Sequence, residues 1–191
     1  YQHFGRNWNN FEEKPNQRIE KVAFADGTIW DLKTIHEKAH NITGTDNADS
    51  FGVGDASSLT YHGLGGNDNI YGGIANDLLY GDAGDDSLNG NAGNDTLYGG
   101  EGKDSFDGGQ GDDTLIGGQG TDRLDGGPGN DTYIFNKGDG EDSILEESGT
   151  DTIQFGEGIK PDDVIAKAVN GSGNINLELS IKGTNDKITV Y

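Results

Sequence analysis

A nine-residue unit repeats eight times without a gap between Gly63 and Ile134, and this short period limits the possible fold more than any other feature. Position one is always glycine, position six is always aspartate and position eight is always apolar. The position-six residues are Asp68, Asp77, Asp86, Asp95, Asp104, Asp113, Asp122 and Asp131. Because a short fixed period is typical of stacked repeats that contact only their neighbours, the pattern predicts an elongated coil rather than an ordinary globule.

The spacing within one unit predicts a tight turn followed by a short strand. Glycines at positions one, two and four permit the positive φ angles of a tight turn. Position eight lies two residues after the aspartate, in the short strand of each unit, and we expect its apolar side chain to face the interior of the coil. Leu64 and Ala75 replace glycine in these turns, as do Asp82 and Asn91, although Asn and Asp tolerate positive φ. We expect the last four units to have the most regular turns and the first two the least regular.

The charge of the chain indicates a cationic ligand. The 191 residues include 34 acidic and 13 basic side chains, and the net charge is −21. This balance disfavours binding to nucleic acid or to an anionic membrane. A disordered acidic linker has a similar composition, but it would not keep an apolar residue in register through eight copies. The absence of cysteine excludes disulfides and thiolate sites, and no apolar run is long enough for a membrane span.

Stacked units would align the aspartates in rows, and such rows require a counter-ion. Neighbouring carboxylates about 5 Å apart repel by roughly 3 kcal/mol at an effective dielectric constant near 20. The repeat contains no histidine or cysteine, so its available ligands are carboxylates and carbonyls, which select a hard cation. Magnesium prefers to retain water, whereas calcium accepts six to eight protein oxygens. The sequence therefore predicts several Ca²⁺ ions.

These units resemble the RTX, or haemolysin-type calcium-binding, repeat, whose consensus is GGxGxDxUx with U apolar. The resemblance covers residues 63–134 strictly and 44–155 loosely. It implies an all-β fold, a right-handed parallel β-roll with two nonapeptides per coil and mixed β and short-helix caps at both ends. One edge would then carry Asp68, Asp86, Asp104 and Asp122, and the other Asp77, Asp95, Asp113 and Asp131.

The resemblance also implies how each ion is held. An ion would bridge the position-six aspartates of units two apart and accept carbonyl oxygens from positions one to four. The expected backbone ligands are Gly81, Ala83, Gly90, Ala92, Gly99, Gly100, Glu101, Gly102, Gly108, Gly109, Gln110, Gly111, Gly117, Gly118, Gln119, Gly120, Gly127 and Gly129. Degenerate copies of the unit on either side of the regular repeat (worn copies) add Asp49, Asp142 and Asp151 as further candidates.

In this family such a roll belongs to large toxins or adhesins exported unfolded by type I secretion machinery. We therefore expect a secreted, extracellular or cell-surface location, folding on contact with extracellular calcium, and no enzymatic activity. A cell-surface receptor remains open as a further partner. The chain begins without methionine or an apolar signal segment, so we expect it to be a fragment of a longer protein.

The regions around the repeat suggest three parts. Residues 1–43 form an N-terminal flank, with a hairpin over 18–31 and a short helix over 32–40. Residues 44–134 form the roll, which is degenerate over 44–62 and regular over 63–134. Residues 135–191 form a C-terminal capping segment that ends in two strands around a turn.

One motif favours a different function. Residues 36–40 read HEKAH, the HExxH pattern of zinc peptidases, with His36 and His40 as the metal ligands. The chain could then be a fragment of a secreted zinc peptidase or self-processing protein with an RTX tail. Thr43 and Asp46 stand where the extended motif needs glycine and histidine, and only 35 residues precede the motif. We expect the match to be coincidental.

Overall fold

The computed structural model describes residues 21–23, 29–31, 41–52, 57–146, 148–171 and 175–191. Apart from one 3₁₀ turn, η1 (Pro161–Asp163), the regular elements of these residues are all strands. The expected N-terminal hairpin is present as β1 (Lys21–Ala23) paired antiparallel with β2 (Ile29–Asp31). The helix expected over 32–40, and the HExxH motif within it, lie outside the described residues.

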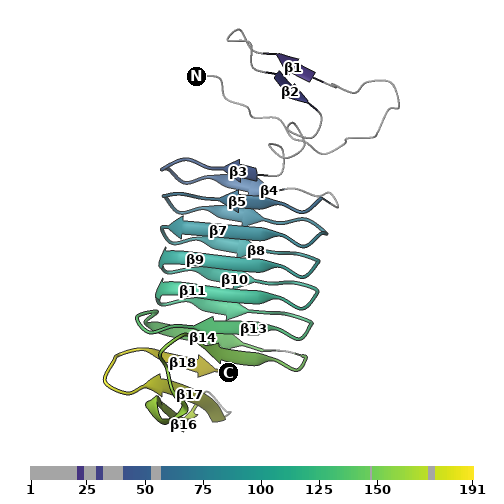
Figure 1. The fold of residues 1–191 in the computed structure, drawn as a ribbon. Coiled ribbons are helices and arrows are strands. Elements are labelled where there is room, and N and C mark those ends of the chain that lie inside the picture. The colour runs from purple at the N-terminus through teal and green to yellow at the C-terminus, as the bar shows by residue number, and fades with distance from the viewer. Residues whose placement is uncertain (1–20, 24–28, 32–40, 53–56, 147, 172–174) are drawn as a thin grey trace.

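Two parallel sheets form the body of the molecule, and successive strands alternate between them (Figure 1). One sheet contains β3 (Asn41–Thr43), β5 (Thr60–His62), β7 (Leu78–Ala83), β9 (Thr96–Gly102), β11 (Thr114–Gly120), β13 (Thr132–Phe135) and β15 (Thr152–Phe155). The other contains β4 (Ser50–Gly52), β6 (Asn69–Tyr71), β8 (Ser87–Asn89), β10 (Ser105–Asp107), β12 (Arg123–Asp125) and β14 (Glu141–Leu145). The expectation of an all-β parallel roll is confirmed.

The register shows that one coil contains two nonapeptides. Phe106 in β10 pairs with Leu88 in β8 on one side and with Leu124 in β12 on the other. The paired residues are 18 positions apart, which is twice the repeat length. Equivalent positions therefore stack directly above one another along each sheet.

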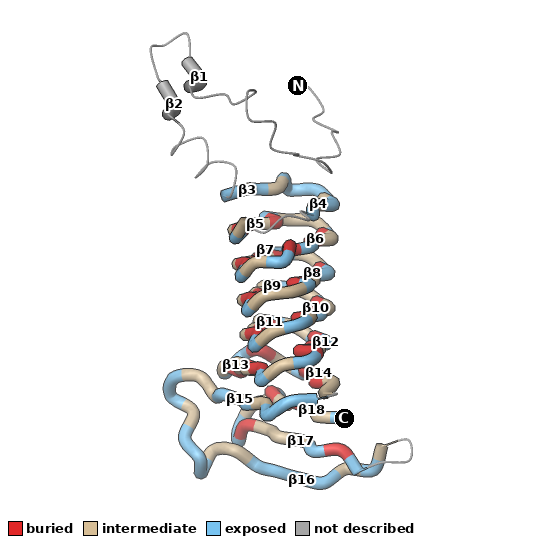
Figure 2. Tube along the Cα trace, turned by 90° about the vertical axis from the view of Figure 1, so that its right-hand side faces the viewer, coloured by how far each residue is buried: buried red, intermediate tan, exposed pale blue. Residues whose placement is uncertain are grey.

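The residues at position eight form the hydrophobic core between the two sheets. All eight are almost completely buried, and the residues beside them in the strands are more exposed. Figure 2 shows the buried segments recurring from coil to coil along the stack. Burial of one such side chain contributes about 1.5–3 kcal/mol, so the repeated row provides the main hydrophobic stabilisation. The full core comprises Leu59, Tyr61, Ile70, Leu79, Leu88, Leu97, Phe106, Leu115, Leu124, Tyr133, Phe135, Ile144, Ile181 and Ile188.

The parallel stack continues past Ile134 and ends in an antiparallel extension. β14 pairs in parallel with β18 (Lys187–Val190), which pairs antiparallel with β17 (Ile175–Ile181), and β17 pairs antiparallel with β16 (Val164–Asn170). The buried Asp186 carboxylate accepts hydrogen bonds from the main-chain N–H groups of Gly138 and Gly140, at 2.9 and 3.3 Å. These contacts connect the C-terminal strands to the last coil of the roll.

The glycines at positions one and four serve different purposes. At position four, Gly111 has φ 134°, and an added Cβ would lie 1.8 Å from the Gly93 carbonyl oxygen. The position-one glycines lie outside the left-handed region, contrary to the expectation that they supply positive φ. A Cβ on Gly99 would instead lie 2.2 Å from the Asp104 carboxylate. Position one therefore requires glycine because any side chain there would clash with the position-six aspartate.

Within the described ranges, three residues other than glycine occupy the left-handed region, all at position two: Leu64, Asp82 and Asn91, with φ of 76°, 71° and 70°. Asp and Asn adopt this conformation at low cost, whereas for leucine it costs roughly 1–2 kcal/mol. In unit two, neither Gly73 at position two nor Ala75 at position four adopts a positive φ, so this turn departs from those of the other units. The strain at Leu64 is therefore local to the first unit.

We predict that Leu64→Asn stabilises the folded roll by roughly 1 kcal/mol, because asparagine tolerates the left-handed backbone at this position. The matched control is Ile74→Asn, since Ile74 is also an exposed apolar side chain but has no positive φ. Thermal unfolding in saturating calcium would measure both. A similar rise in melting temperature for the two variants would show that surface polarity, and not backbone strain, is responsible.

Candidate metal sites

The position-six aspartates form two continuous rows, one along each edge of the roll. In each row, the main-chain N–H of one aspartate donates a hydrogen bond to Oδ1 of the aspartate one coil further along. Asp86 N donates to Asp104 Oδ1 at 2.8 Å, and Asp95 N donates to Asp113 Oδ1 at 2.7 Å. The first row contains Asp49, Asp68, Asp86, Asp104, Asp122 and Asp142. The second contains Asp77, Asp95, Asp113, Asp131 and Asp151.

The two rows therefore include the three candidates from the worn copies. Asp122 N donates to Asp142 Oδ1 at 3.0 Å, and Asp131 N donates to Asp151 Oδ1 at 2.9 Å. These pairs are separated by 20 residues instead of 18, so the row accommodates two inserted residues. Asp49 joins at the other end, where its N–H donates to Asp68 Oδ1 at 2.7 Å.

The second carboxylate oxygen, Oδ2, has no hydrogen-bond partner in seven of these aspartates. Each of these atoms is buried. A buried polar atom without a partner is costly, and a buried charge without one is more costly still. The seven are Asp68, Asp86, Asp95, Asp104, Asp113, Asp122 and Asp131. Rows of unpartnered buried oxygens fit the binding of a cation.

The Oδ2 atoms lie close to main-chain carbonyls. A Cβ built on Gly99 would be 2.2 Å from Asp104 Oδ2 and 2.4 Å from the Gly117 carbonyl oxygen, so both oxygens border the same small space. The same pairing of a carboxylate with the position-one carbonyl one coil further occurs at Gly63, Gly72, Gly81, Gly90 and Gly108. An all-oxygen environment suits a hard cation such as Ca²⁺.

The predicted carbonyl ligands differ in how the structure uses them. At position one, the carbonyls of Gly81, Gly90, Gly99, Gly108 and Gly117 lie nearest the carboxylates. At position three, the carbonyls of Ala83, Glu101 and Gln110 accept main-chain hydrogen bonds from the preceding coil at 2.8–3.0 Å. A carbonyl oxygen has two lone pairs, so these bonds are compatible with metal ligation. Ligation stays a prediction for all of these carbonyls, and also for those of Ala92, Gly100, Gly102, Gly109, Gly111, Gly118, Gln119, Gly120, Gly127 and Gly129.

Two aspartates of the rows use Oδ2 to close their own turns. Gly73 N donates to Asp77 Oδ2 at 2.6 Å, and Thr45 N donates to Asp49 Oδ2 at 2.6 Å. These carboxylates are therefore the least suited to an ion. Asp77 belongs to unit two, where an irregular turn was expected, whereas Asp68 in unit one keeps the arrangement of the later units.

The electrostatics of the rows favour neutralisation of the carboxylates. Burial raises the pKa of Asp95 and Asp104 to about 7, against the lowering effect of the main-chain hydrogen bond each accepts. Neighbouring carboxylates raise these pKa values further. The pKa is raised to about 6 at Asp113 and to about 8 at Asp142, again chiefly by burial. A proton or a metal ion relieves the same unfavourable charge.

Sequence reasoning missed one acidic residue beside these rows. A carboxylate oxygen of Glu146 lies within 4.8 Å of one from Asp131 and one from Asp151. The signal was present, because residues 146–151 read EESGTD and align with GGPGND at 126–131. In that alignment Glu146 takes the position of an otherwise invariant glycine.

Comparison with known families agrees with this geometry. The model of the RTX calcium-binding nonapeptide repeat, in four copies, matches residues 62–97 and again residues 98–133. The chain is an RTX repeat protein. A second model, the haemolysin-type calcium binding protein related domain, matches residues 8–34 of this RTX protein. A search of curated proteins gives no match.

The RTX matches coincide with the coils that carry the unpartnered carboxylates, and RTX repeats of this type imply calcium binding. The roll is a calcium-binding module of the RTX class. Within the described part of this RTX protein, no helix has the length and apolar character needed to cross a membrane.

The pKa values predict that acid stabilises the calcium-free roll. The folded pKa of Asp95 and Asp104, about 7, exceeds the value of about 3.9 for an unfolded aspartate. Their contribution to stability is therefore complete below the unfolded pKa and is lost as pH rises through about 7. Far-UV circular dichroism in chelator should show more strand at about pH 5 than at about pH 8. Equal or reversed signals would contradict this prediction.

Replacement of Asp104 by asparagine should weaken calcium binding and stabilise the calcium-free state, because it removes a buried charge but keeps the acceptor for Asp86 N–H. We expect about a tenfold or larger loss of affinity at the adjacent sites, equivalent to about 1.4 kcal/mol. Isothermal titration would measure it. Asp107→Asn is the matched control, since Asp107 is exposed in the following strand. Equal losses for both variants would count against a specific role for position six.

Proposed function

We propose that this roll folds when it binds calcium outside the cell and stays unstructured where calcium is scarce. The observation that carries the proposal is the set of seven buried carboxylate oxygens without a partner. Each must be neutralised for the roll to be stable near neutral pH. Protonation achieves this only at lower pH, so a divalent cation is the natural counter-ion.

Coupling between binding and folding follows from the same arrangement. The ligands of one ion come from successive coils, so the site exists only when those coils are stacked. The free energy of binding then contributes to the free energy of folding. Stabilisation grows with the concentration of free calcium, by RT ln(1 + [L]/Kd) for each site. Extracellular calcium modules typically bind at about 10⁻⁴–10⁻³ M, which would leave the chain unfolded inside a cell.

The proposed ligands are the carboxylates of Asp68, Asp86, Asp95, Asp104, Asp113, Asp122 and Asp131 with the carbonyls of positions one to four in the turns. Asp142 and Asp151 extend the two rows and are added at their C-terminal ends. Asp49 and Asp77 are the weakest candidates, because main-chain N–H groups already occupy their Oδ2 atoms.

The biological setting is proposed from the family. RTX repeats are characteristic of secreted or extracellular bacterial proteins, and we place this chain in a toxin or adhesin exported by type I secretion machinery. Residues 1–43 would be the N-terminal flank, 44–134 the roll and 135–191 the C-terminal cap. The net charge of −21 disfavours nucleic acid as a partner, and a cell-surface receptor is a further proposed partner.

The role we propose is structural and not catalytic, as is typical of RTX rolls. The alternative, a zinc peptidase fragment, depends on residues 36–40 alone. Stoichiometric zinc binding together with peptide cleavage would favour that alternative. Calcium-dependent folding without zinc binding would favour the structural role.

Circular dichroism of the whole chain tests the proposed function directly. We expect a disordered spectrum in chelator and a strand spectrum after addition of calcium at about 10⁻³ M or above. Magnesium at the same concentration should give little change, because it prefers to keep its water ligands. A chain that is equally folded with calcium, magnesium and chelator would overturn the proposal.

A further inference from the structure

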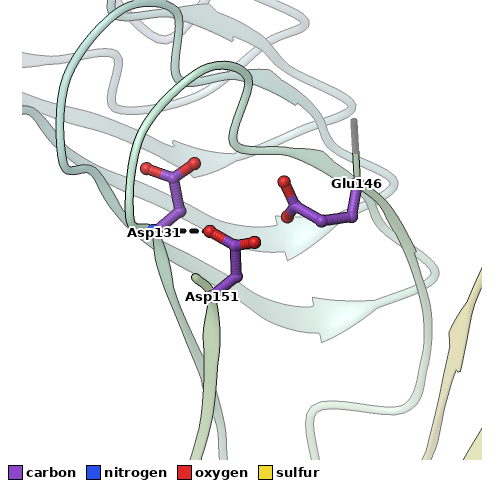
Figure 3. A group of neighbouring side chains, drawn as sticks. All are labelled: Asp131, Glu146 and Asp151. Atoms are coloured by element: carbon purple, nitrogen blue, oxygen red, sulfur yellow. Dashed lines mark hydrogen bonds between the residues drawn. The ribbon is translucent and has the colours of Figure 1, made fainter. Parts of the chain in front are cut away.

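We propose that Glu146, Asp131 and Asp151 form a distinct calcium site at the C-terminal end of the second aspartate row, with a glutamate carboxylate in place of a glycine carbonyl. The inference rests on the proposed calcium function and extends it to a residue outside the repeat consensus. Figure 3 shows the three side chains, with the Glu146 carboxylate directed toward the two aspartates.

The register places Glu146 at position one of a worn repeat. Thr132 in β13 pairs with Thr152 in β15, and Pro128 forms a parallel bridge with Ser148. The turn keeps the same stacking, because a Cβ on Gly149 would lie 1.7 Å from the Gly129 carbonyl oxygen. The corresponding distance from Gly129 to the Gly111 oxygen in the previous coil is also 1.7 Å. The coil is thus continued, but its first glycine is replaced by an acid.

The unit that precedes Glu146 also differs in which oxygen lies beside the position-six carboxylate. In a regular coil, a Cβ on Gly108 would lie 2.6 Å from both Asp113 Oδ2 and the Gly126 carbonyl oxygen. In the eighth unit, a Cβ on Gly126 would lie 2.4 Å from Asp131 Oδ2 and 2.5 Å from the Tyr133 hydroxyl oxygen. The Tyr133 hydroxyl thus borders Asp131 Oδ2 where a glycine carbonyl does in a regular coil, and this hydroxyl in turn contacts the Glu146 carboxylate.

Tyr133 positions the glutamate. It occupies position eight, where the other seven units have leucine, isoleucine or phenylalanine, and its ring is buried in the core. Its hydroxyl accepts a hydrogen bond from Gly126 N–H at 2.9 Å and donates one to Glu146 Oε2 at 2.6 Å. Among the eight regular units, the one that has tyrosine at position eight is therefore the one whose side chain contacts Glu146.

A second observation points to a ligand within this cluster. Asp131 is only 1% exposed, and its Oδ2 has no partner. One carboxylate oxygen from each of the three acids lies within 4.8 Å of those from the other two. Three carboxylates so close together repel one another, and an oxygen-only cluster of this charge suits Ca²⁺.

The charge of the cluster also predicts how its calcium affinity compares with that of the nonapeptide sites. A nonapeptide site supplies two aspartates and neutral carbonyls, whereas this site supplies three carboxylates. Calcium affinity in protein sites rises with the number of charged ligands. We therefore infer that this site fills before the nonapeptide sites and releases calcium after them.

The test is Glu146→Gln in the whole chain, which removes one charge and keeps an acceptor for the Tyr133 hydroxyl. Isothermal titration with calcium should show loss of the tightest binding event, or at least a tenfold weakening of it, with the later events retained. Glu157→Gln is the matched control, since Glu157 is an exposed acid in the loop after β15. A titration of Glu146→Gln that matches the control would overturn the inference.

A second variant covers the case in which Glu146→Gln does not fold. Tyr133→Phe keeps the buried ring and removes only the hydroxyl, so it should fold in saturating calcium and bind the first ion more weakly. The same first-ion affinity in Tyr133→Phe as in the unaltered chain would overturn the positioning role of the tyrosine and, with it, the inference. Absence of any calcium binding by the unaltered chain would instead defeat the proposed function. Normal calcium binding that is insensitive to both variants would defeat the Glu146 site alone.

Discussion

The hydrogen bond from each position-six N–H to the carboxylate one coil further is the interaction on which the structure depends. It runs the length of both edges, with donor–acceptor distances of 2.7–3.0 Å. It satisfies Oδ1 of the accepting aspartate and holds the side chain inward, and in seven of these aspartates Oδ2 is buried without a hydrogen-bond partner. The hydrogen bond that orders the stack therefore also buries the negative charge of the carboxylates. One interaction thus accounts both for the stacking of the coils and for their need for a cation.

Much of this arrangement could be predicted from the sequence, because an exact period leaves few options. The apolar row at position eight and the aspartate row at position six lie where the spacing places them. Position one was misinterpreted: a sequence shows that glycine is required, but not whether the reason is φ or space. The cause at Gly99 is the carboxylate of Asp104 above its Cα, a contact that only the folded turn creates.

Glu146 escaped sequence reasoning for a related reason. Its register depends on two residues inserted after Asp131, and an insertion hides an otherwise regular alignment. The same shift separates Asp122 from Asp142, which the pattern of aspartate and apolar residues still revealed. Periodicity thus identifies residues that obey the repeat, whereas the alignment of EESGTD with GGPGND, which places Glu146 at position one, stands out once the pairing of β13 with β15 fixes the register.

The 18-residue register has a consequence for how the module responds to its surroundings. Asp104, for example, contacts the coil before it through Oδ1 and borders the Gly117 carbonyl of the coil after it through Oδ2, so adjacent sites of the proposed kind would share side chains. Under the proposed calcium binding, an ion held at one aspartate would therefore also order the ligands of the neighbouring site, as in a one-dimensional array with nearest-neighbour coupling. Such an array would respond steeply to a narrow change in ion concentration, and the steepness of its response would grow with the number of coils.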